Sequence, residues 1–338
     1  MSFKVQIEPS GHAFEVEPNE SMLDAALRHG LTLPYGCRSG YCGACKSKVI
    51  SGQIDYGEDE PAALTDQEQI VGMVLPCIAK PASDLVLEIK ELTDLQNISV
   101  RTLPAKIAHL EPLSPTVMGL WLKLPDDDRL PYRAGQYVNF LLPDGRKRAF
   151  SIANPPCNDD LLEFHIGFVS GGQFSEQVFG AMQEKDLLRI EGPHGSFFLR
   201  EAEDRPLLLL ATGTGFGPLQ AIIEQTLSEG SQRPIHLYWG ARHKADLYRH
   251  DRALRWASEY RNVHYHPLLS QPLPEDQWEG RTGYVQDAVL ADFDDLSQFD
   301  LYACGMPEMV LDARRRLVAE RGLDSERCYS DAFEWAKD

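Results

Sequence analysis

Four cysteines carry the clearest chemical signal in this sequence. Cys37, Cys42 and Cys45 follow one another as C-x4-C-x2-C, and Cys77 comes after 31 further residues. Thiolates at this spacing can hold a [2Fe–2S] cluster, which accepts and donates one electron at a time. Three glycines within and beside the loop let the backbone turn sharply and approach such a cluster closely. We therefore expect these four cysteines to be metal ligands.

Disulfide bonds and a zinc site are the alternatives for the same cysteines. Disulfides need an oxidising compartment, and the first 30 residues contain no apolar stretch typical of a signal peptide. Zinc sites usually pair two C-x2-4-C halves, and only Cys42 with Cys45 has that spacing. The remaining cysteines, Cys157, Cys304 and Cys328, are scattered, as expected in a reducing cytoplasm. The pattern favours a cluster and a cytoplasmic location.

The composition limits the class of protein and of partner. The chain has 338 residues, 43% of them hydrophobic, and no apolar run of membrane-spanning length. Its net charge of −18 argues against nucleic acid and anionic membranes as partners. Acidic residues recur after the cysteine loop, either as a solvated surface or as a docking patch for a basic redox partner. These residues are Glu58, Asp59, Glu60, Asp66 and Glu68.

The hydrophobic pattern divides the chain into three expected domains. Residues 1–92 combine alternating strands, a helix that begins after Ser21 and the cysteine loop, which suits a β-grasp ferredoxin. Residues 93–103 have weak periodicity and are expected to be a linker. Short strands broken by Pro and Gly predict a small antiparallel barrel over 104–202. Apolar strands alternating with helices predict an α/β domain with a parallel sheet over 203–338.

The expected strands are short. In the barrel they are 117–124, 136–142, 149–153, 161–169 and 187–191, and in the last domain 207–211, 235–239, 263–267 and 299–303.

The barrel contains residues suited to a planar, phosphate-bearing cofactor. In Arg148-Ala149-Phe150-Ser151, alternation places Arg148 and Phe150 on one face of a strand. An aromatic ring offers a stacking surface, an arginine suits a diphosphate, and a hydroxyl can reach the reactive nitrogen of a flavin. Gly172 precedes an expected helix, whose first N–H groups can bind an anion. Each of these motifs alone is common in ordinary turns.

The last domain contains a strand–glycine loop–helix unit. The apolar strand 207–211 runs into Thr212-Gly213-Thr214-Gly215-Phe216-Gly217-Pro218 and then an apolar-periodic helix. This geometry places a pyrophosphate on a helix N-terminus, although G-x-G-x-G-P differs from the G-x-G-x-x-G dinucleotide fingerprint. A second strand ends in Cys304-Gly305-Met306-Pro307, with Glu308 opening a helix.

The order of these motifs resembles the ferredoxin–NAD(P) reductase superfamily, with a plant-type ferredoxin at the N-terminus. R-A-F-S resembles its R-x-Y-S flavin motif, with Phe150 in place of the usual tyrosine. Gly192-Pro193-His194-Gly195 resembles its G-P-x-G loop, and the glycine loop and C-G-M-P resemble its nicotinamide-binding motifs. The resemblance covers essentially the whole chain and implies FAD rather than FMN.

The resemblance also implies site residues. Flavin contacts are expected at Tyr137, Arg148, Phe150, Ser151, His165, Ile166, Gly167, Gly172, Gln173, Phe174 and Ser175. Nicotinamide contacts are expected at Gly213, Thr214, Gly215, Phe216, Gly217, Pro218, Cys304, Gly305, Met306 and Pro307. Ser151 and Cys304 would lie at the reacting atoms, and Phe333 would cover the flavin, with Trp335 as the alternative.

The residues after Trp239-Gly240 leave the coenzyme open. Arg242 and Lys244 come first and suit NADPH, while Asp246 is the nearest acid of the kind that binds the ribose of NADH. Similar one-chain reductases prefer NADH, so NADH is expected and NADPH stays possible.

The domain order matches the one-chain reductases of bacterial oxygenases and the CDP-6-deoxy-Δ3,4-glucoseen type that serves an iron–sulfur sugar dehydrase. The implied activity is transfer of hydride from NADH to FAD, then of single electrons through the cluster to a protein acceptor such as an oxygenase or dehydrase component. Two alternatives stay open. The chain could be an electron carrier or interaction module defined by its partner, or a flavin or ferric reductase that does not depend on its cluster.

Overall fold

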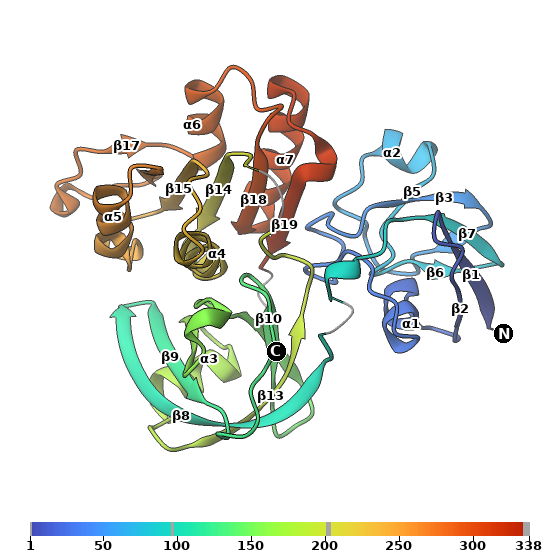
Figure 1. Cartoon of the computed structure of the whole chain (residues 1–338), viewed down its shortest axis with the longest axis horizontal. Coiled ribbons are helices and arrows are strands. Elements are labelled where there is room, and N and C mark those ends of the chain that lie inside the picture. The colour runs from blue at the N-terminus through green and yellow to red at the C-terminus, as the bar shows by residue number, and fades with distance from the viewer. Residues whose placement is uncertain (1, 96–97, 201–203, 334–338) are drawn as a thin grey trace. The chain divides into compact units, whose positions relative to one another are not determined.

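The computed structural model describes residues 2–95, 98–200 and 204–333. The chain divides into two compact units, which are described separately (Figure 1). The first runs to Ile98 and takes in Ser330–Ala332, and the second runs from Ser99 to Tyr329 and includes Phe333.

A five-stranded sheet in the order β2-β1-β7-β3-β5 forms the first unit. Its strands are β1 (Phe3–Glu8), β2 (Ala13–Val16), β3 (Ser47–Ser51), β5 (Met73–Val74) and β7 (Leu85–Glu88), with a separate pair, β4 (Ile54–Asp55) and β6 (Lys80–Pro81). β1 is antiparallel to β2 and parallel to β7 because the chain crosses over through helix α1 (Met22–Arg28). Ser21 caps α1, as predicted, by accepting the N–H of Asp24. A short helix, α2 (Asp66–Ile70), precedes β5. This is the expected β-grasp arrangement.

The second unit begins with a six-stranded antiparallel sheet in the order β11-β10-β13-β8-β9-β12. The strands are β8 (Arg101–Ser114), β9 (Val117–Lys123), β10 (Tyr137–Leu141), β11 (Lys147–Ser151), β12 (Leu162–Gly167) and β13 (Leu187–His194). The two end strands meet where Ala153 N–H donates to the Glu163 carbonyl at 2.8 Å, so the sheet closes into the expected barrel. Helix α3 (Gln173–Gly180) follows β12.

The linker boundary needs a correction. β8 begins at Arg101, so the last three residues of the expected linker 93–103 are strand, and the strand 101–114 as a whole was not predicted. Leu103, Ala105 and Ile107 alternate into the barrel core. The alternation is visible only when residues on both sides of position 103 are considered together.

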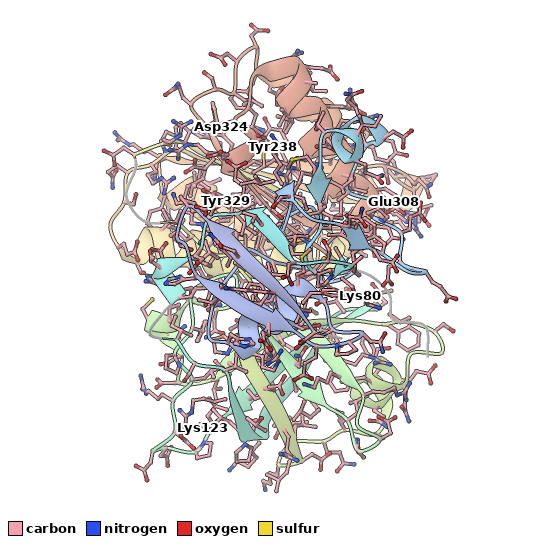
Figure 2. The ribbon with its side chains drawn as sticks, turned by 90° about the vertical axis from the view of Figure 1, so that its right-hand side faces the viewer. Lys80, Lys123, Tyr238, Glu308, Asp324 and Tyr329 are labelled. Carbon is pink, nitrogen blue, oxygen red and sulfur yellow. The ribbon has the colours of Figure 1, made fainter. Side chains whose placement is uncertain are left out.

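The other large sheet has six strands in the order β17-β16-β15-β14-β18-β19 and belongs to the second unit except for Ser330–Ala332 of β19, which are grouped with the first. Its strands are β14 (Leu207–Thr212), β15 (Ile235–Ala241), β16 (Val263–Leu269), β17 (Arg281–Thr282), β18 (Asp300–Gly305) and β19 (Cys328–Ala332). Strands β14 to β18 pair in parallel, as expected, and β14 is buried on both faces, which explains its continuous apolar run. The helices are α4 (Phe216–Ser228), α5 (His250–Glu259), α6 (Val285–Asp292) and α7 (Pro307–Arg321), with Glu308 in the first turn of α7 (Figure 2).

Six 3-10 turns connect these elements in the described part of the chain: η1 (Thr93–Leu95), η2 (Pro156–Asn158), η3 (Gly213–Gly215), η4 (Lys244–Asp246), η5 (Pro274–Asp276) and η6 (Ser325–Arg327). None of the helices in the described ranges has the length and apolarity that a membrane span requires.

Candidate redox site

The cysteine loop is shaped by residues with unusual backbone conformations. Arg38, Gly40 and Gly43 have φ values of 62°, 85° and 69°, in the left-handed region that glycine adopts most easily. Gly36 is needed for a different reason, because a Cβ at this position would lie 3.1 Å from the Cys42 sulfur. The backbone therefore folds tightly around the cysteine side chains.

The four thiols are arranged as two pairs. Cys42 N–H donates to the Cys37 sulfur at 3.3 Å, and Cys37 N–H donates to the Cys42 sulfur at 3.4 Å. A hydrogen bond from the Cys42 thiol lowers the pKa of Cys37 to about 5, and a hydrogen bond with Cys45 together with burial raises the pKa of Cys77. Cys37 is thus partnered with Cys42, and Cys45 with Cys77.

This pairing fits a [2Fe–2S] cluster. Its four thiolates are shared between two irons, two to each, so two separate pairs supply the ligands. Within the described ranges, no three or more His, Cys, Asp or Glu side chains are grouped so as to hold one ion. Two more N–H groups, from Ser39 and Ala44, point at the sulfurs of Cys37 and Cys42 at 3.5 Å. Such hydrogen bonds tune a cluster's reduction potential.

Ser151 lies where three barrel strands meet. It is opposite Tyr137 on β10, and Tyr137 is opposite His194 on β13. The Ser151 hydroxyl is buried and has no hydrogen-bond partner among the residues that the structure describes. Leaving a buried hydroxyl unsatisfied costs about 1–3 kcal/mol, so this atom is suited to a cofactor atom that completes its hydrogen bonding. The arrangement fits the flavin contact expected of Ser151.

The aromatic residues of the flavin motif lie partly in the barrel core. The Phe150 ring packs against Phe140 and Phe174, with ring centroids 5.5 Å and 5.3 Å away. Phe174 is buried in the same core. Arg148 is on the same strand face as Phe150, as alternation predicted, and donates to the Lys147 carbonyl at 3.1 Å. The flavin contacts expected of these three residues stay predictions.

Helix α3 begins at Gln173, the predicted position, and Gly172 is its N-cap. The Ser175 hydroxyl accepts the Val169 N–H and contacts the Val169 carbonyl, both at 3.1 Å, so it secures the preceding turn. Gln173 contacts Arg146 through its side chain. The first N–H groups of α3 have no side-chain cap from Gly172 and are suited to an anion.

The two nicotinamide motifs lie side by side at the ends of adjacent strands. Ala211 of β14 is paired with Cys304 of β18. A Cβ at Gly215 would overlap the Cys304 carbonyl, and a Cβ at Gly305 would overlap the Thr212 side chain. The Thr212 hydroxyl also accepts the Met306 N–H at 2.9 Å. The glycines therefore allow one loop to rest backbone to backbone on the other.

Each of the two nicotinamide motifs leads into a helix, as the sequence predicted. α4 begins at Phe216 with Pro218 in its first turn, and α7 begins at Pro307. Phe333 N–H donates to the Gly305 carbonyl at 2.8 Å, so Phe333 lies beside the second motif. Trp335, the alternative to Phe333, lies outside the described residues. The role of Phe333 at the flavin stays a prediction.

His165, another expected flavin contact, has protein partners at both ring nitrogens. Nε2 lies 3.0 Å from Glu163 Oε1, and Nδ1 lies 3.1 Å from the Tyr248 hydroxyl. Burial lowers the pKa of His165, while its hydrogen bond with Glu163 acts in the opposite direction. Burial alone would raise the pKa of Glu163, but the His165 hydrogen bond and nearby arginines lower it to about 2. The neighbouring Ile166 and Gly167 continue β12.

Sequence reasoning missed Glu163 and Tyr248. The only available signal was the spacing of Glu163 and His165 two residues apart on a strand whose other face is apolar. That spacing predicts a shared face, but not that the face is buried.

The residues considered for coenzyme choice lie after β15. The Asp246 carboxylate accepts the His243 N–H at 3.1 Å and so closes turn η4, while Lys244 donates to the Asp276 carbonyl at 3.4 Å. Arg242 is exposed at the end of the strand. The nearest acid is therefore engaged in local structure.

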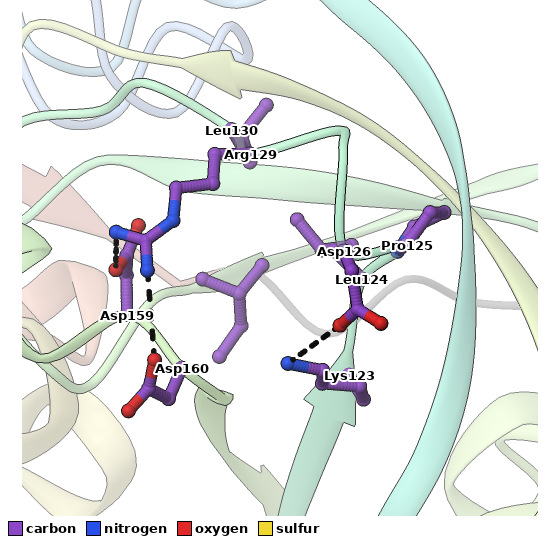
Figure 3. A pocket seen from close by; sticks show the side chains of 9 residues that line it. Lys123, Leu124, Pro125, Asp126, Arg129, Leu130, Asp159 and Asp160 are labelled. Carbon is purple, nitrogen blue, oxygen red and sulfur yellow. Dashed lines mark hydrogen bonds and ion pairs between the residues drawn. The ribbon is translucent and has the colours of Figure 1, made fainter.

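One pocket on the barrel contains none of the expected cofactor residues (Figure 3). Its lining residues are Lys123, Leu124, Pro125, Asp126, Arg129, Leu130, Asp159, Asp160 and Leu162. Arg129 pairs with Asp159 and Asp160 at 2.9 Å and 3.5 Å, and Lys123 pairs with Asp126 at 3.2 Å. Its two basic side chains are both paired with carboxylates of the lining.

Comparison with protein families agrees with the three-part architecture. Residues 5–82 match the 2Fe-2S iron–sulfur cluster binding domain, 104–199 the oxidoreductase FAD-binding domain, and 209–315 the oxidoreductase NAD-binding domain. The fold and these domains define an NAD(P)H-dependent oxidoreductase that carries FAD and a [2Fe–2S] cluster. The expected fold class and cofactors are confirmed.

Relatives extend along the whole chain. It is 38% identical over 333 residues to the CDP-6-deoxy-L-threo-D-glycero-4-hexulose-3-dehydrase reductase of Yersinia pestis, covering 98% of this chain and 99% of that one. It is 39% identical over 341 residues to the phenol 2-monooxygenase reductase component DmpP of Pseudomonas sp. CF600, covering 98% and 96%. The structure of the Amycolatopsis cytochrome P450 reductase GcoB matches with a TM-score of 0.76 and 29% identity, covering 98% of each chain. The chain belongs to the ferredoxin–NAD(P) reductase superfamily, in the group with an N-terminal [2Fe–2S] ferredoxin.

Proposed function

We propose that this protein oxidises NADH and delivers single electrons through its cluster to a protein acceptor. The observation that carries the proposal is the pairing of the four thiols, Cys37 with Cys42 and Cys45 with Cys77, on a chain that also has FAD and NAD domains. A nicotinamide gives up two electrons together and a [2Fe–2S] cluster accepts one, and bound FAD supplies the conversion between them.

Residues of the second unit would hold and orient the two organic cofactors. Ser151 would offer the flavin a hydroxyl that has no hydrogen-bond partner in the described structure, and Arg148 would supply positive charge for its diphosphate. The N-terminus of α4, with the glycine loop before it, suits the coenzyme pyrophosphate. Cys304 and Gly305 end β18 beside that loop, where the nicotinamide ring is expected. Phe333, whose N–H is hydrogen-bonded to the Gly305 carbonyl, would cover the flavin when no coenzyme is bound.

NADH is proposed as the coenzyme, supported by the match to an NAD-binding domain. The exposed Arg242 could instead accept the additional phosphate of NADPH. Steady-state kcat/KM for both coenzymes tests this choice. A tenfold preference for NADPH would contradict it, and Arg242→Ala should then lower the NADPH value selectively.

The acceptor is proposed to be a partner protein in the cytoplasm, an oxygenase or dehydrase component. The support comes from relatives named as reductases of a sugar dehydrase and of a phenol monooxygenase. The exposed acids Glu58, Asp59 and Glu60 lie beside the cluster loop, because Ala63 N–H donates to the Gly40 carbonyl at 2.9 Å. They suit a basic docking surface on the acceptor.

The proposed function is tested by anaerobic titration of the purified holoprotein with NADH. We expect the absorption of oxidised flavin and of the cluster to be bleached together, with three electrons taken up per chain, two by FAD and one by the cluster. Absence of cluster absorption, or uptake of only two electrons, would contradict the relay.

A further inference from the structure

The outer face of β12 carries buried polar residues. Leu162, Phe164 and Ile166 point into the barrel core, so alternation directs Glu163 and His165 outward. Both are nevertheless buried, with relative exposures of 6% and 5%. An outward face that is buried must be covered by another part of the molecule, and here the nicotinamide domain of the same compact unit covers it.

The covering residues come from the nicotinamide loop and from the start of α5. A Cβ at Gly217 would lie 3.3 Å from His165 Nδ1, so the loop backbone passes directly over the imidazole. The Phe216 ring is nearly parallel to the His165 ring, with centroids 6.5 Å apart, and it also stacks on Trp239 with centroids 3.9 Å apart. The Tyr248 ring stands edge-on to His165, Phe216 and Trp239.

The polar atoms of this contact satisfy one another. Glu163 Oε1 lies 3.0 Å from His165 Nε2 and the Tyr248 hydroxyl lies 3.1 Å from Nδ1, so both ring nitrogens have a partner. Arg249 also donates to Glu163 Oε1 at 3.2 Å, so the buried carboxylate has a cationic partner. Such a network holds one geometry, because any shift of the loop leaves buried polar groups unsatisfied.

We propose that Glu163, His165 and Tyr248 are positioning residues that register the nicotinamide loop on the flavin barrel and so set the approach of the coenzyme to the flavin. This inference rests on the proposed function, and it assigns His165 a task other than direct flavin binding. Hydride transfer depends steeply on geometry, since a misplacement of about 1 Å can slow a reaction about 100-fold. The contact between the barrel and the nicotinamide loop would therefore affect the rate of hydride transfer, although its residues do not touch the reacting atoms.

Tyr248→Phe tests the proposal by removing a single oxygen atom. In the holoprotein we expect flavin reduction at saturating NADH to slow about tenfold. The FAD content should be unchanged, and amide hydrogen exchange of residues 212–219 should become faster. His165→Gln should behave alike. Electron delivery from chemically reduced protein to an artificial acceptor should stay at the wild-type rate.

Tyr265→Phe is the matched control. The Tyr265 hydroxyl lies 3.0 Å from His250 Nδ1, which is the same kind of tyrosine–histidine hydrogen bond, but inside the nicotinamide domain. It should leave flavin reduction and loop exchange unchanged. The proposal is overturned if Tyr248→Phe matches this control, or if His165→Gln loses FAD while the flavin that remains is reduced at the normal rate. Failure of NADH to reduce the wild-type flavin would instead refute the proposed function.

Discussion

The cluster loop and the nicotinamide loop are both rich in glycine, and two of their glycine requirements differ in origin. In the cluster loop, Gly40 and Gly43 adopt positive φ, a local requirement of a chain that turns within a few residues. In the nicotinamide loop, Gly215 has an ordinary φ of −59° and is needed because the backbone of Cys304 lies against it. The positive φ values are a property of the local turn, whereas the requirement at Gly215 comes from a strand almost 90 residues away.

The two motifs therefore differ in how strongly the sequence alone predicts them. Cysteine spacing and local glycines contain nearly all the information for the first site. The second site needs two distant segments that are assembled only by pairing of β14 with β18.

Removing one cluster ligand should abolish the function of the cluster region and leave that of the nicotinamide region intact. We expect Cys42→Ser to lower electron delivery to a protein acceptor by at least about two orders of magnitude, because the one-electron carrier is lost. Flavin reduction by NADH, measured by stopped-flow absorbance, should stay near the wild-type rate. The exposed Cys157 provides the control variant Cys157→Ser, which should change neither rate. Unchanged acceptor turnover in Cys42→Ser would favour a flavin or ferric reductase that does not use its cluster.

A methyl group at Gly215 should disrupt the nicotinamide region by crowding alone. Because the added Cβ would overlap the Cys304 carbonyl, Gly215→Ala should lower the free energy of unfolding by about 3 kcal/mol. Gly180 at the end of α3 has no atom within 4 Å of an added Cβ, so Gly180→Ala should be neutral or slightly stabilising. Urea unfolding followed by tryptophan fluorescence reports on the second unit, since the sequence has no tryptophan before Trp121. Equal stability of the two variants would refute the close loop contact.

Removing the Ser151 hydroxyl should weaken FAD binding and leave the cluster unchanged. Loss of one hydrogen bond of about 1.4 kcal/mol corresponds to a roughly tenfold higher FAD dissociation constant in Ser151→Ala. Equilibrium dialysis or fluorescence titration of the FAD-free protein measures it. Ser47 is also a buried hydroxyl without a hydrogen-bond partner in the described structure, but it lies in the first unit. Ser47→Ala should bind FAD normally, and an equal loss in both variants would argue against a specific contact.

Lowering the pH should reduce the free energy of unfolding of the nicotinamide domain through protonation of His236. Burial and the neighbouring His264 and His266 lower the pKa of His236 to about 4, below its ordinary value near 6.5. Between these values the unfolded chain binds the proton more readily, so stability is present above pH 6.5 and is lost as the pH falls towards 4. His236→Phe should flatten this dependence when unfolding is followed by tryptophan fluorescence. An unchanged pH slope would show that His236 does not contribute to it.

The strands and helices were largely predictable because their patterns are local. The alternation of Val5 and Ile7, the cap at Ser21 and the apolar run before Thr212 each depend on a few neighbouring residues. The strand from Arg101 was missed because its inward residues continue past a boundary that was drawn at a proline. The order of the strands in each sheet has no local signature.

The individual flavin contacts were less predictable than the domain that holds them. The motif around Arg148 predicts a cofactor site, and alternation correctly separates its two faces. The same motif does not show that Phe150 packs on Phe140 or that Ser151 is left without a partner. Those facts depend on which strands become neighbours in the closed barrel.

The sequence by itself determined the cofactor classes and the order of the domains. Cysteine spacing and glycine loops are chemical requirements of a cluster and of phosphate groups, and they act over a few residues. Only the tertiary structure decided that His165 lies against Tyr248 and Glu163, and that Gly215 lies against Cys304. Contacts of this kind follow from packing between segments far apart in the chain, and burial converts an ordinary polar residue into one that must find a specific partner.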